Sequence, residues 1–467
     1  MSTTDSVHPM TVGQQALWAL GKLSGSASFG NLCTALRLSP SVDVRRLEAA
    51  LAVLYARHDI LRARLVSTDA GIPGVAIGEI DEMLFVVRRA EGWDEADRDA
   101  WVEAEAQRPF DLAHHACRFA LLVQMPVWNE APPEATLLIT VHHIVGDFRS
   151  IEILTQELEV LYRSGSAPAT QEPDSGGAQF LDYARHEQTW LTSREAEQQA
   201  RFWRERLNPL DDQQFPSRRS RRASAMFLGV EHRHALTPAA TAAIRSATHV
   251  VGVTPFTFMF GAFALTVAAL TRRTTLAIGT TVDLRRERPL RRAVGYLVNT
   301  VPVVFRIEPK QSFAAFALDA ARSITSSVVH GKLPFARIAR QAVPGNGATQ
   351  PLTLGGSLTW LKFEPDFGAG GAPDRLILDT LRQGKARLVP SSHALTLALE
   401  DRPTAIECIW SLDMESFAPE FGDQIGECFS HIAGSAAENV FRPTGELLAH
   451  AADALAPSGS VMETLEL

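Results

Sequence analysis

The chain has 467 residues, of which 46% are hydrophobic and 21% are charged, the balance of a folded protein and not of a disordered one. Its 45 basic and 53 acidic residues give a formal net charge of −8, which argues against nucleic acid as the main partner. One hydrophobic core rarely serves so long a chain, so we expect two domains or two lobes.

The cysteines and the N-terminus indicate the compartment. The cysteines are scattered, with no CxxC pair and no metal-ligand spacing, at Cys33, Cys117, Cys408 and Cys428. Each joins an apolar run, so we expect buried thiols in a reducing cytosol and no metal site. The first residues carry neither the basic nor the apolar part of a signal peptide. A cytoplasmic protein is therefore expected.

Residues 1–170 alternate predicted helices and strands, and we assign them to an N-terminal lobe. Apolar residues at helical spacing predict helices at Met10–Trp18, Val44–His58 and Trp101–Arg108. Apolar and β-branched runs predict strands after Arg62 and at Asn31–Leu38, Cys117–Met125 and Thr136–Val141.

The stretch Ala135–Tyr162 holds the strongest functional signal. Its strand is followed by the loop His142–Asp147, and then by a helix whose apolar residues recur at Ile151, Leu154, Leu158 and Leu161. Loops between a strand and a helix often present reactive groups. Because the unperturbed pKa of imidazole lies near neutrality, a histidine here is a candidate general base.

Two adjacent histidines are weak evidence by themselves. With 14 histidines in the chain, chance predicts roughly 0.4 such pairs, and a second pair, His114-His115, has no comparable context. We read that second pair as structural. Asp147, four residues after His143 and between a strong strand and a strong helix, distinguishes the first pair.

The second part of the chain echoes the first in plan. Ser164–Ala178 is rich in Ser, Gly, Pro and Ala, so we assign residues 171–210 to a linker and a connecting helix. Residues 211–455 form the second predicted lobe, and residues 456–467 a flexible tail. The predicted helices of the second lobe are Thr237–Thr248, Pro255–Leu270 and Pro419–Ala437. The predicted strands of the second lobe are Val230–Ala235, Leu276–Asp283, Leu352–Trp360, Ala394–Glu400 and Ala405–Leu412.

Val250–Leu270 is uncharged over 21 residues, which raises the question of a membrane span. Thr254-Pro255 has the form of an N-cap followed by Pro at the first helical position. The remaining helix, Pro255–Leu270, would span about 24 Å, short of a roughly 30 Å hydrocarbon core. It is predicted to be a buried core helix, with no membrane contact.

The loop His142–Asp147 resembles the HHxxxDG signature of nonribosomal peptide synthetase condensation domains. Other segments match the family's motifs in the same order. Met10–Trp18 is similar to the first motif, Arg57–Arg62 to RHxxLR, Pro109–Leu112 to the PFDL turn and Gly295–Thr300 to VGxxVNT. The resemblance covers roughly residues 9 to 450, and the set is far more specific than any one motif.

The resemblance implies an α/β fold of two chloramphenicol acetyltransferase-like lobes, forming a V-shaped pseudo-dimer with a tunnel at the junction. It implies that His143 acts on the nucleophile, as general base or by positioning it, while His142 is structural. Asp147 is expected to pair with Arg62, since a buried carboxylate needs a partner. Phe148, Gly146 and Asn299 are expected to line the tunnel.

The implied activity is condensation of a carrier-bound acyl or peptidyl thioester with an amine or hydroxyl, giving an amide or an ester in nonribosomal peptide or hybrid polyketide biosynthesis. No metal or bound cofactor is implied, because partner carrier proteins supply the phosphopantetheine arm. The expected partners are acyl or peptidyl carrier proteins and a small-molecule or carrier-bound acceptor. The chain carries no adenylation, thiolation or thioesterase sequence, so a free-standing monomeric enzyme is expected, with an excised domain as the alternative.

Two departures from the family pattern keep other readings open. Phe148 stands where the family has Gly, and in the first motif Gly13 and Ala19 stand where bulkier or polar residues are usual. A degenerate domain that recruits a partner, a related acyltransferase and an epimerase are the alternatives.

Two arginine clusters are read as solvated loops or as sites for an acidic carrier or a phosphate. They are Arg285, Arg286, Arg288, Arg291 and Arg292, and Arg218, Arg219, Arg221 and Arg222.

Overall fold

The computed structural model describes residues 7–24, 28–68, 71–125, 133–164, 178–208, 210, 215, 228–286, 288–341, 352–362, 376–380, 388–390, 393–414, 416–418 and 421–455. The chain divides into two compact units. Unit 1 comprises Met1–Ser193, Asp283–Val298 and Pro365–Gly384, and unit 2 comprises Arg194–Val282, Asn299–Glu364 and Lys385–Leu467. The predicted lobes are continuous in sequence, whereas each unit draws on three segments.

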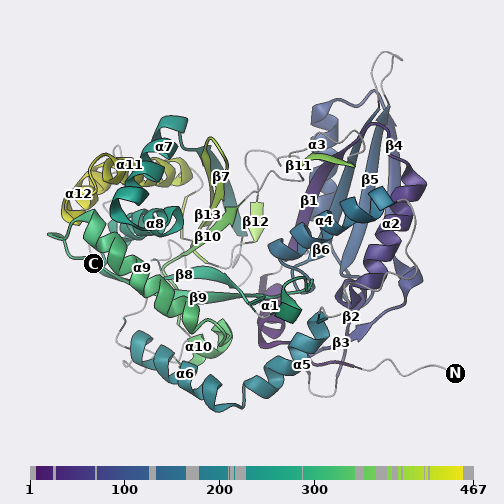
Figure 1. The fold of residues 1–467 in the computed structure, drawn as a ribbon, viewed down its shortest axis with the longest axis horizontal. Coiled ribbons are helices and arrows are strands. Elements are labelled where there is room, and N and C mark those ends of the chain that lie inside the picture. Colours follow the sequence, from purple (N-terminus) through teal and green to yellow (C-terminus); the bar gives the residue numbers. More distant parts are fainter. Residues whose placement is uncertain are drawn as a thin grey trace. The chain divides into compact units, whose positions relative to one another are not determined.

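Unit 1 is built on a five-stranded sheet of order β11-β1-β6-β5-β4 (Figure 1). Only β4 and β5 pair in parallel. Its strands are β1 (Asn31–Leu38), β4 (Phe85–Glu91), β5 (Cys117–Met125), β6 (Glu134–His142) and β11 (Ile377–Thr380), with a separate hairpin of β2 (Ala63–Val66) and β3 (Gly74–Ile77). Its helices are α1 (Val12–Ser24), α2 (Val44–Arg57), α3 (Glu95–Gln107), α4 (Phe148–Ser164) and α5 (Phe180–Trp190).

Alternating side chains of this sheet enter two cores. Leu137, Ile139 and Val141 of β6 pack with the apolar faces of α2 and α4. Leu138 faces the other way, into a smaller cluster with Trp101 of α3. The period of two along a strand explains this division. It leaves β6 with both faces covered, a rigid support for the loop that follows it.

Unit 2 is built on a seven-stranded sheet of order β12-β7-β14-β13-β10-β8-β9 (Figure 1). Its strands are β7 (Leu228–Ala235), β8 (Thr275–Asp283), β9 (Val298–Arg306), β10 (Ser357–Lys362), β12 (Leu388–Pro390), β13 (Leu395–Asp401) and β14 (Ile406–Asp413). Its helices are α6 (Arg194–Leu207), α7 (Pro238–Val251), α8 (Pro255–Thr271), α9 (Phe313–Val329), α10 (Phe335–Gln341), α11 (Phe421–Glu438) and α12 (Thr444–Leu455).

The apolar segment singled out in the sequence is α8, and it is the core helix of unit 2. Thr254 caps it by accepting from the backbone N–H of Thr257, and Pro255 opens it. Its residues from Thr257 to Ala268 are all buried. Among the described residues no single helix is long and apolar enough to cross a membrane, and α7 and α8 pass such a test only as a pair bent by 104°. The prediction of a buried core helix is confirmed.

Several predicted elements differ in extent. The connecting helix predicted within residues 171–210 is two helices, α5 and α6, because the chain turns at residues 191–193. Helix α3 begins at Glu95, since Asp94 accepts from the backbone N–H of Asp97 and caps it there. Cys117, Cys408 and Cys428 are buried, and Cys33 is partly buried. Residues 165–177, residues 456–467 and the second arginine cluster lie outside the described residues.

Candidate active site

The loop between β6 and α4 is held at both ends. Ile144 and Val145 are buried in the core of unit 1. The carbonyl of Ile144 accepts a hydrogen bond from Gln14 Nε2 at 2.7 Å, which connects the first motif on α1 to this loop. At the far end the carboxylate of Asp147 accepts from the backbone N–H of Ser150 at 2.8 Å and caps α4. The positions of the two histidines are therefore fixed by the fold.

His143 has one tautomer that its surroundings favour. Its Nδ1 lies 2.7 Å from the carbonyl oxygen of Gly146, which can only accept, so Nδ1 carries the proton and donates. This leaves Nε2 as the acceptor of the neutral ring. Burial lowers the pKa of His143 below its ordinary value, although Gly146 and Asp147 oppose the shift. The imidazole is thus neutral at pH 7 and equipped to take a proton at Nε2.

His142 is buried and faces the backbone. Its Nδ1 accepts from the N–H of Ile144 at 3.1 Å. Burial, with a smaller contribution from His143, lowers its pKa to about 4. Gly30 lies against this ring with φ of +82°, and a Cβ there would come within 2.8 Å of Nε2. Glycine is therefore required at position 30 both for its conformation and for the space that His142 occupies.

Asp147 pairs with Arg285, so the predicted pairing with Arg62 is wrong. The two side chains meet in a bidentate ion pair with N–O distances of 2.8 and 2.9 Å, and both are almost completely buried. The carboxylate also accepts from the backbone N–H of Leu297 at 2.9 Å and from the hydroxyl of Ser150 at 2.8 Å. These bonds use both oxygens of the carboxylate, so Asp147 ties the loop to Arg285 and to the backbone of Leu297.

Arg62 instead braces the turn that follows α2. Its guanidinium donates to the carbonyls of Tyr55 and Ala56 at 2.9 and 2.6 Å, and pairs with Asp59 at 2.7 Å. It also donates to the carbonyl of Gly78. Carbonyls left without partners at the end of a helix attract such a donor. The support that Arg62 gives is local to the end of α2.

Arg285 is the functional residue that sequence reasoning misplaced. The prediction of a solvated loop is wrong for it, since its side chain is 3% exposed, whereas Arg286, Arg288, Arg291 and Arg292 are exposed. It donates further to the carbonyl of Ala293 and to the hydroxyl of Ser150. Its position two residues after β8, a largely buried strand, was the available signal. The segment Asp283–Val298 joins unit 1 through these bonds.

Tyr296, on the same segment, forms one wall beside His143. The two rings meet edge to face with their centroids 4.9 Å apart. Burial, and then the charge of Asp147, raises the pKa of Tyr296 to about 12, so its phenol stays protonated. A Cβ at position 13 would lie 2.6 Å from Cε1 of Tyr296. The unusual Gly13 of the first motif therefore makes room for Tyr296.

Phe148 is the first residue of α4, and its side chain is 39% exposed. Among the described residues only Arg272 has a positive φ without being a glycine, so the backbone of Phe148 is not in the left-handed region. The substitution of the motif glycine thus introduces no backbone strain. Gly146 is buried, and a Cβ on it would lie 3.1 Å from Val141.

Asn299 belongs to unit 2, where its amide holds a turn. Its Nδ2 donates to the carbonyls of Gly331 and Leu333 at 2.9 and 2.8 Å, and its Oδ1 accepts from the N–H of Phe335 at 2.9 Å. The amide is buried and occupied by backbone. In the structure this amide fixes the approach to α10, and the place of Asn299 in the tunnel lining stays a prediction.

Glu157 on α4 was not singled out from the sequence. It accepts from Arg57, His58 and Arg292, each at 3.0 Å. These partners outweigh the cost of burying its charge and lower its pKa to about 2. His58 of the RHxxLR-like run is thus a partner of this carboxylate.

The family assignment follows from the comparisons with known proteins. Residues 5–353 match the family model described as "Condensation domain". The phosphinothricin tripeptide synthetase PhsC of Streptomyces viridochromogenes is 27% identical over 93% of this chain, which spans 39% of the length of that protein. The chain therefore belongs to the condensation domain family.

Solved structures of the family share this fold. The condensation domain of the Monacolin K polyketide synthase MokA has a TM-score of 0.77 at 18% identity, covering 94% of this chain and 99% of that one. The X-domain of teicoplanin biosynthesis, solved in complex with OxyB, has a TM-score of 0.76 at 24% identity, covering 96% of this chain and 97% of that one. Both support the α/β fold with two chloramphenicol acetyltransferase-like lobes.

Proposed function

We propose that the chain condenses a carrier-bound acyl or peptidyl thioester with an amine or hydroxyl acceptor, forming an amide or an ester. The observation that carries the proposal is His143, whose Nδ1 donates to Gly146 and whose lowered pKa keeps Nε2 available as a base. A thioester is already activated, so the acceptor needs only orientation and the removal of one proton. The pantetheine arms belong to partner carrier proteins, as substrates.

In the proposed reaction, the acceptor nitrogen or oxygen attacks the thioester carbonyl carbon while Nε2 of His143 takes its proton. The new C–N or C–O bond forms, and the C–S bond then breaks. The proton on Nε2 passes to the departing sulfur, which leaves as the pantetheine thiol. The imidazole is neutral again, and no external oxidant, reductant or metal is consumed.

The first prediction concerns His143. A carrier loaded with an acyl thioester is incubated with a panel of amines and alcohols, and acyl transfer is followed by intact-protein mass spectrometry. We expect His143→Ala to lower the rate by about 10²–10⁴, the usual contribution of a general base. His114→Ala is the matched control, because His114 is an exposed member of the other His-His pair. Equal rates for the native protein and His143→Ala would contradict the proposal.

A second candidate function is recruitment of a partner protein. Phe148 in place of the motif glycine favours it, together with the likeness to an X-domain that forms a complex with OxyB. A recruiting domain would leave every loaded carrier intact. Absence of transfer across the panel, with the fold preserved, would favour recruitment over condensation.

A further inference from the structure

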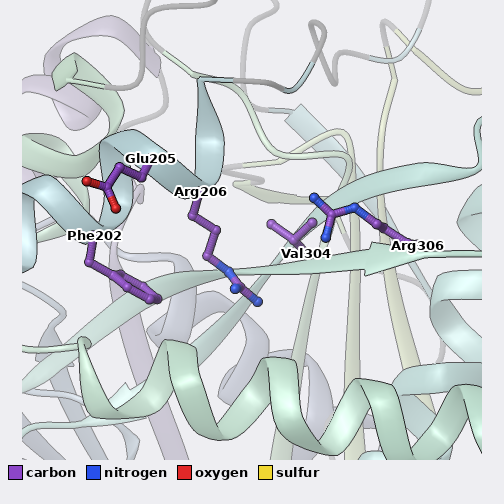
Figure 2. A pocket seen from close by; sticks show the side chains of 5 residues that line it. All are labelled: Phe202, Glu205, Arg206, Val304 and Arg306. Atoms are coloured by element: carbon purple, nitrogen blue, oxygen red, sulfur yellow. The ribbon is translucent and has the colours of Figure 1, made fainter.

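A cavity of about 240 Å³ opens in unit 2, between α6 and β9. Phe202, Glu205 and Arg206 of α6 line one side, and Val304 and Arg306 of β9 line the other. In Figure 2 the side chains of Arg206 and Arg306 extend toward one another on either side of Val304. Two guanidinium groups thus share one small hollow.

Arg206 is held in place by neutral groups. Its Nη2 donates to the hydroxyl of Ser323 at 2.6 Å, and that hydroxyl donates to the carbonyl of Val304 at 2.7 Å. Its Nε is buried and has no hydrogen-bond partner within the described residues. Burial, followed by the charge of Arg306, lowers the pKa of Arg206 below its ordinary value. The positive charge is therefore held in position without an anion beside it.

Arg306 is exposed, and among the described residues no carboxylate lies within ion-pair distance of it or of Arg206. Glu205 lines the cavity, but in Figure 2 its carboxylate lies on the opposite side of Arg206 from Arg306. The positive charges of Arg206 and Arg306 repel each other in this cavity. An anion bound between them would offset that repulsion.

Phe202 and Val304 give the cavity its apolar walls. The ring of Phe202 stacks on His330 with centroids 3.6 Å apart and planes within 6° of parallel. His330 is held in turn by Trp203, whose indole N–H donates to its carbonyl at 3.0 Å. The stacked rings fix the side of the cavity next to Arg206.

We propose that this cavity binds a doubly charged phosphate group, as inorganic phosphate or as the phosphate monoester of a small metabolite. A dianion in the cavity would offset the charges of both guanidinium groups. Arginine is well suited to phosphate because its donors match the spacing of the phosphate oxygens. The proposal is independent of His143 and of acyl transfer.

Two acidic residues near the cavity allow a second test, in which removing a negative charge should strengthen phosphate binding. The hollow continues past Glu308 and Asp319. Asp319 is engaged by Arg322 and by Gln311 Nε2. Glu308 lies two residues after Arg306, and its charge opposes a bound anion at short range. Glu308→Gln is therefore expected to strengthen phosphate binding two- to threefold.

The test is isothermal titration calorimetry of the full chain at constant ionic strength, with inorganic phosphate, glycerol 3-phosphate and acetate as probes. Arg306→Gln, at an exposed side chain, and Arg206→Gln are each expected to weaken phosphate binding about tenfold, the loss of one charge-assisted hydrogen bond. Arg340→Gln removes an exposed arginine of α10, outside the cavity, and is expected to change nothing. Tighter binding of glycerol 3-phosphate would identify a monoester, and tighter binding of inorganic phosphate the free ion.

The proposal is overturned if phosphate binds no better than acetate, or if Arg306→Gln binds phosphate like the native protein. Equal weakening by Arg340→Gln would show a general charge effect and would also overturn it. Circular dichroism confirms the folding of each variant. Should Arg206→Gln unfold, Arg306→Gln and Glu308→Gln decide the outcome by themselves.

Discussion

His143 and Asp147 stand four residues apart, and their hydrogen bonds give them separate tasks. Asp147 is occupied by Arg285, Ser150 and the backbone of Leu297. The group that orients His143 is the carbonyl of Gly146. A carbonyl fixes the tautomer as a carboxylate would, but it does not add a full charge to stabilise an imidazolium. Burial lowers the pKa of this ring, so the imidazole is neutral at pH 7.

The contact of Gly13 with Tyr296 gives the second prediction. In Gly13→Ala the new methyl group would lie 2.6 Å from Cε1 of Tyr296, so the ring must move away from His143. We expect a loss of stability of about 1–3 kcal/mol, the usual cost of overpacking, measured by chemical denaturation. We also expect slower acyl transfer.

Gly21→Ala is the control for this prediction, because Gly21 lies on the same helix and a Cβ there would meet Phe29 at 3.3 Å. The double variant Gly13→Ala/Tyr296→Leu should recover stability. If Gly13→Ala is as stable as the native protein, Tyr296 is not packed as described.

At the scale of elements, helix α4 anchors the segment Asp283–Val298 at two points. Asp147 at its N-cap binds Arg285, and Glu157, about three turns later, binds Arg292. Because this segment also carries Tyr296, the wall beside His143 depends on both ion pairs. Mutations in α4 far from the histidines are therefore expected to act on the site.

A double-mutant cycle tests the first anchor. Arg285→Met or Asp147→Asn alone leaves a buried partner uncompensated, which costs about 3–5 kcal/mol. Together the two changes should cost much less than their sum, giving a large coupling energy. Asp147→Asn with Arg62→Met should be additive within about 0.5 kcal/mol, since these residues share no contact in the structure. A large coupling with Arg62 and none with Arg285 would restore the pairing that the sequence suggested.

The element scale also shows what sequence can predict. The apolar and β-branched run of β6 and the helical spacing of Ile151, Leu154, Leu158 and Leu161 are local signals, and both elements formed where predicted. The partner of Asp147 is set by the tertiary fold, because Arg285 lies 138 residues away in the sequence. The sequence alone does not show which of the two arginines, Arg62 or Arg285, pairs with Asp147. The role of Glu157 was hidden for the same reason, because its three partners come from two distant segments.

At the scale of the whole molecule, unit 1 is assembled from three stretches of chain. The sequence suggests two continuous lobes because its composition marks the linker between them. Composition does not show that a later segment such as Asp283–Val298 packs in unit 1. The arrangement of the two lobes as a V with a tunnel between them stays a prediction. The division of the sequence into continuous lobes at residues 1–170 and 211–455 also stays a prediction.

Acid stability is a property of the whole fold, and the buried groups Glu157 and His142 both contribute to it. The pKa of Glu157 is lowered from 4.5 to about 2, so its stabilising effect is complete above pH 4.5 and is lost as the pH falls toward 2. The pKa of His142 is lowered from 6.5 to about 4. As the pH falls from 6.5 toward 4, the unfolded chain binds a proton at this residue while the folded protein does not, so the folded protein loses stability. Both effects destabilise the protein in acid, each on the order of 3 kcal/mol.

Denaturation with guanidinium between pH 7 and pH 3 measures this dependence. The native protein is expected to lose stability across both windows, and His114→Ala to behave like it. Glu157→Gln should be less stable at pH 7 and should show a flatter curve below pH 4.5. If the pH dependence of stability below pH 4.5 has the same slope in Glu157→Gln as in the native protein, Glu157 does not cause it.

The most direct test of the central claim is an NMR titration of the imidazole of His143. The protein is labelled with ¹⁵N-histidine, and His143→Gln identifies the signal. We predict a neutral ring protonated at Nδ1 at pH 7 and a pKa below 6.5. This result would establish Nε2 as the available base before any substrate is known. A ring protonated at Nε2, or a pKa above 6.5, would contradict the role assigned to His143.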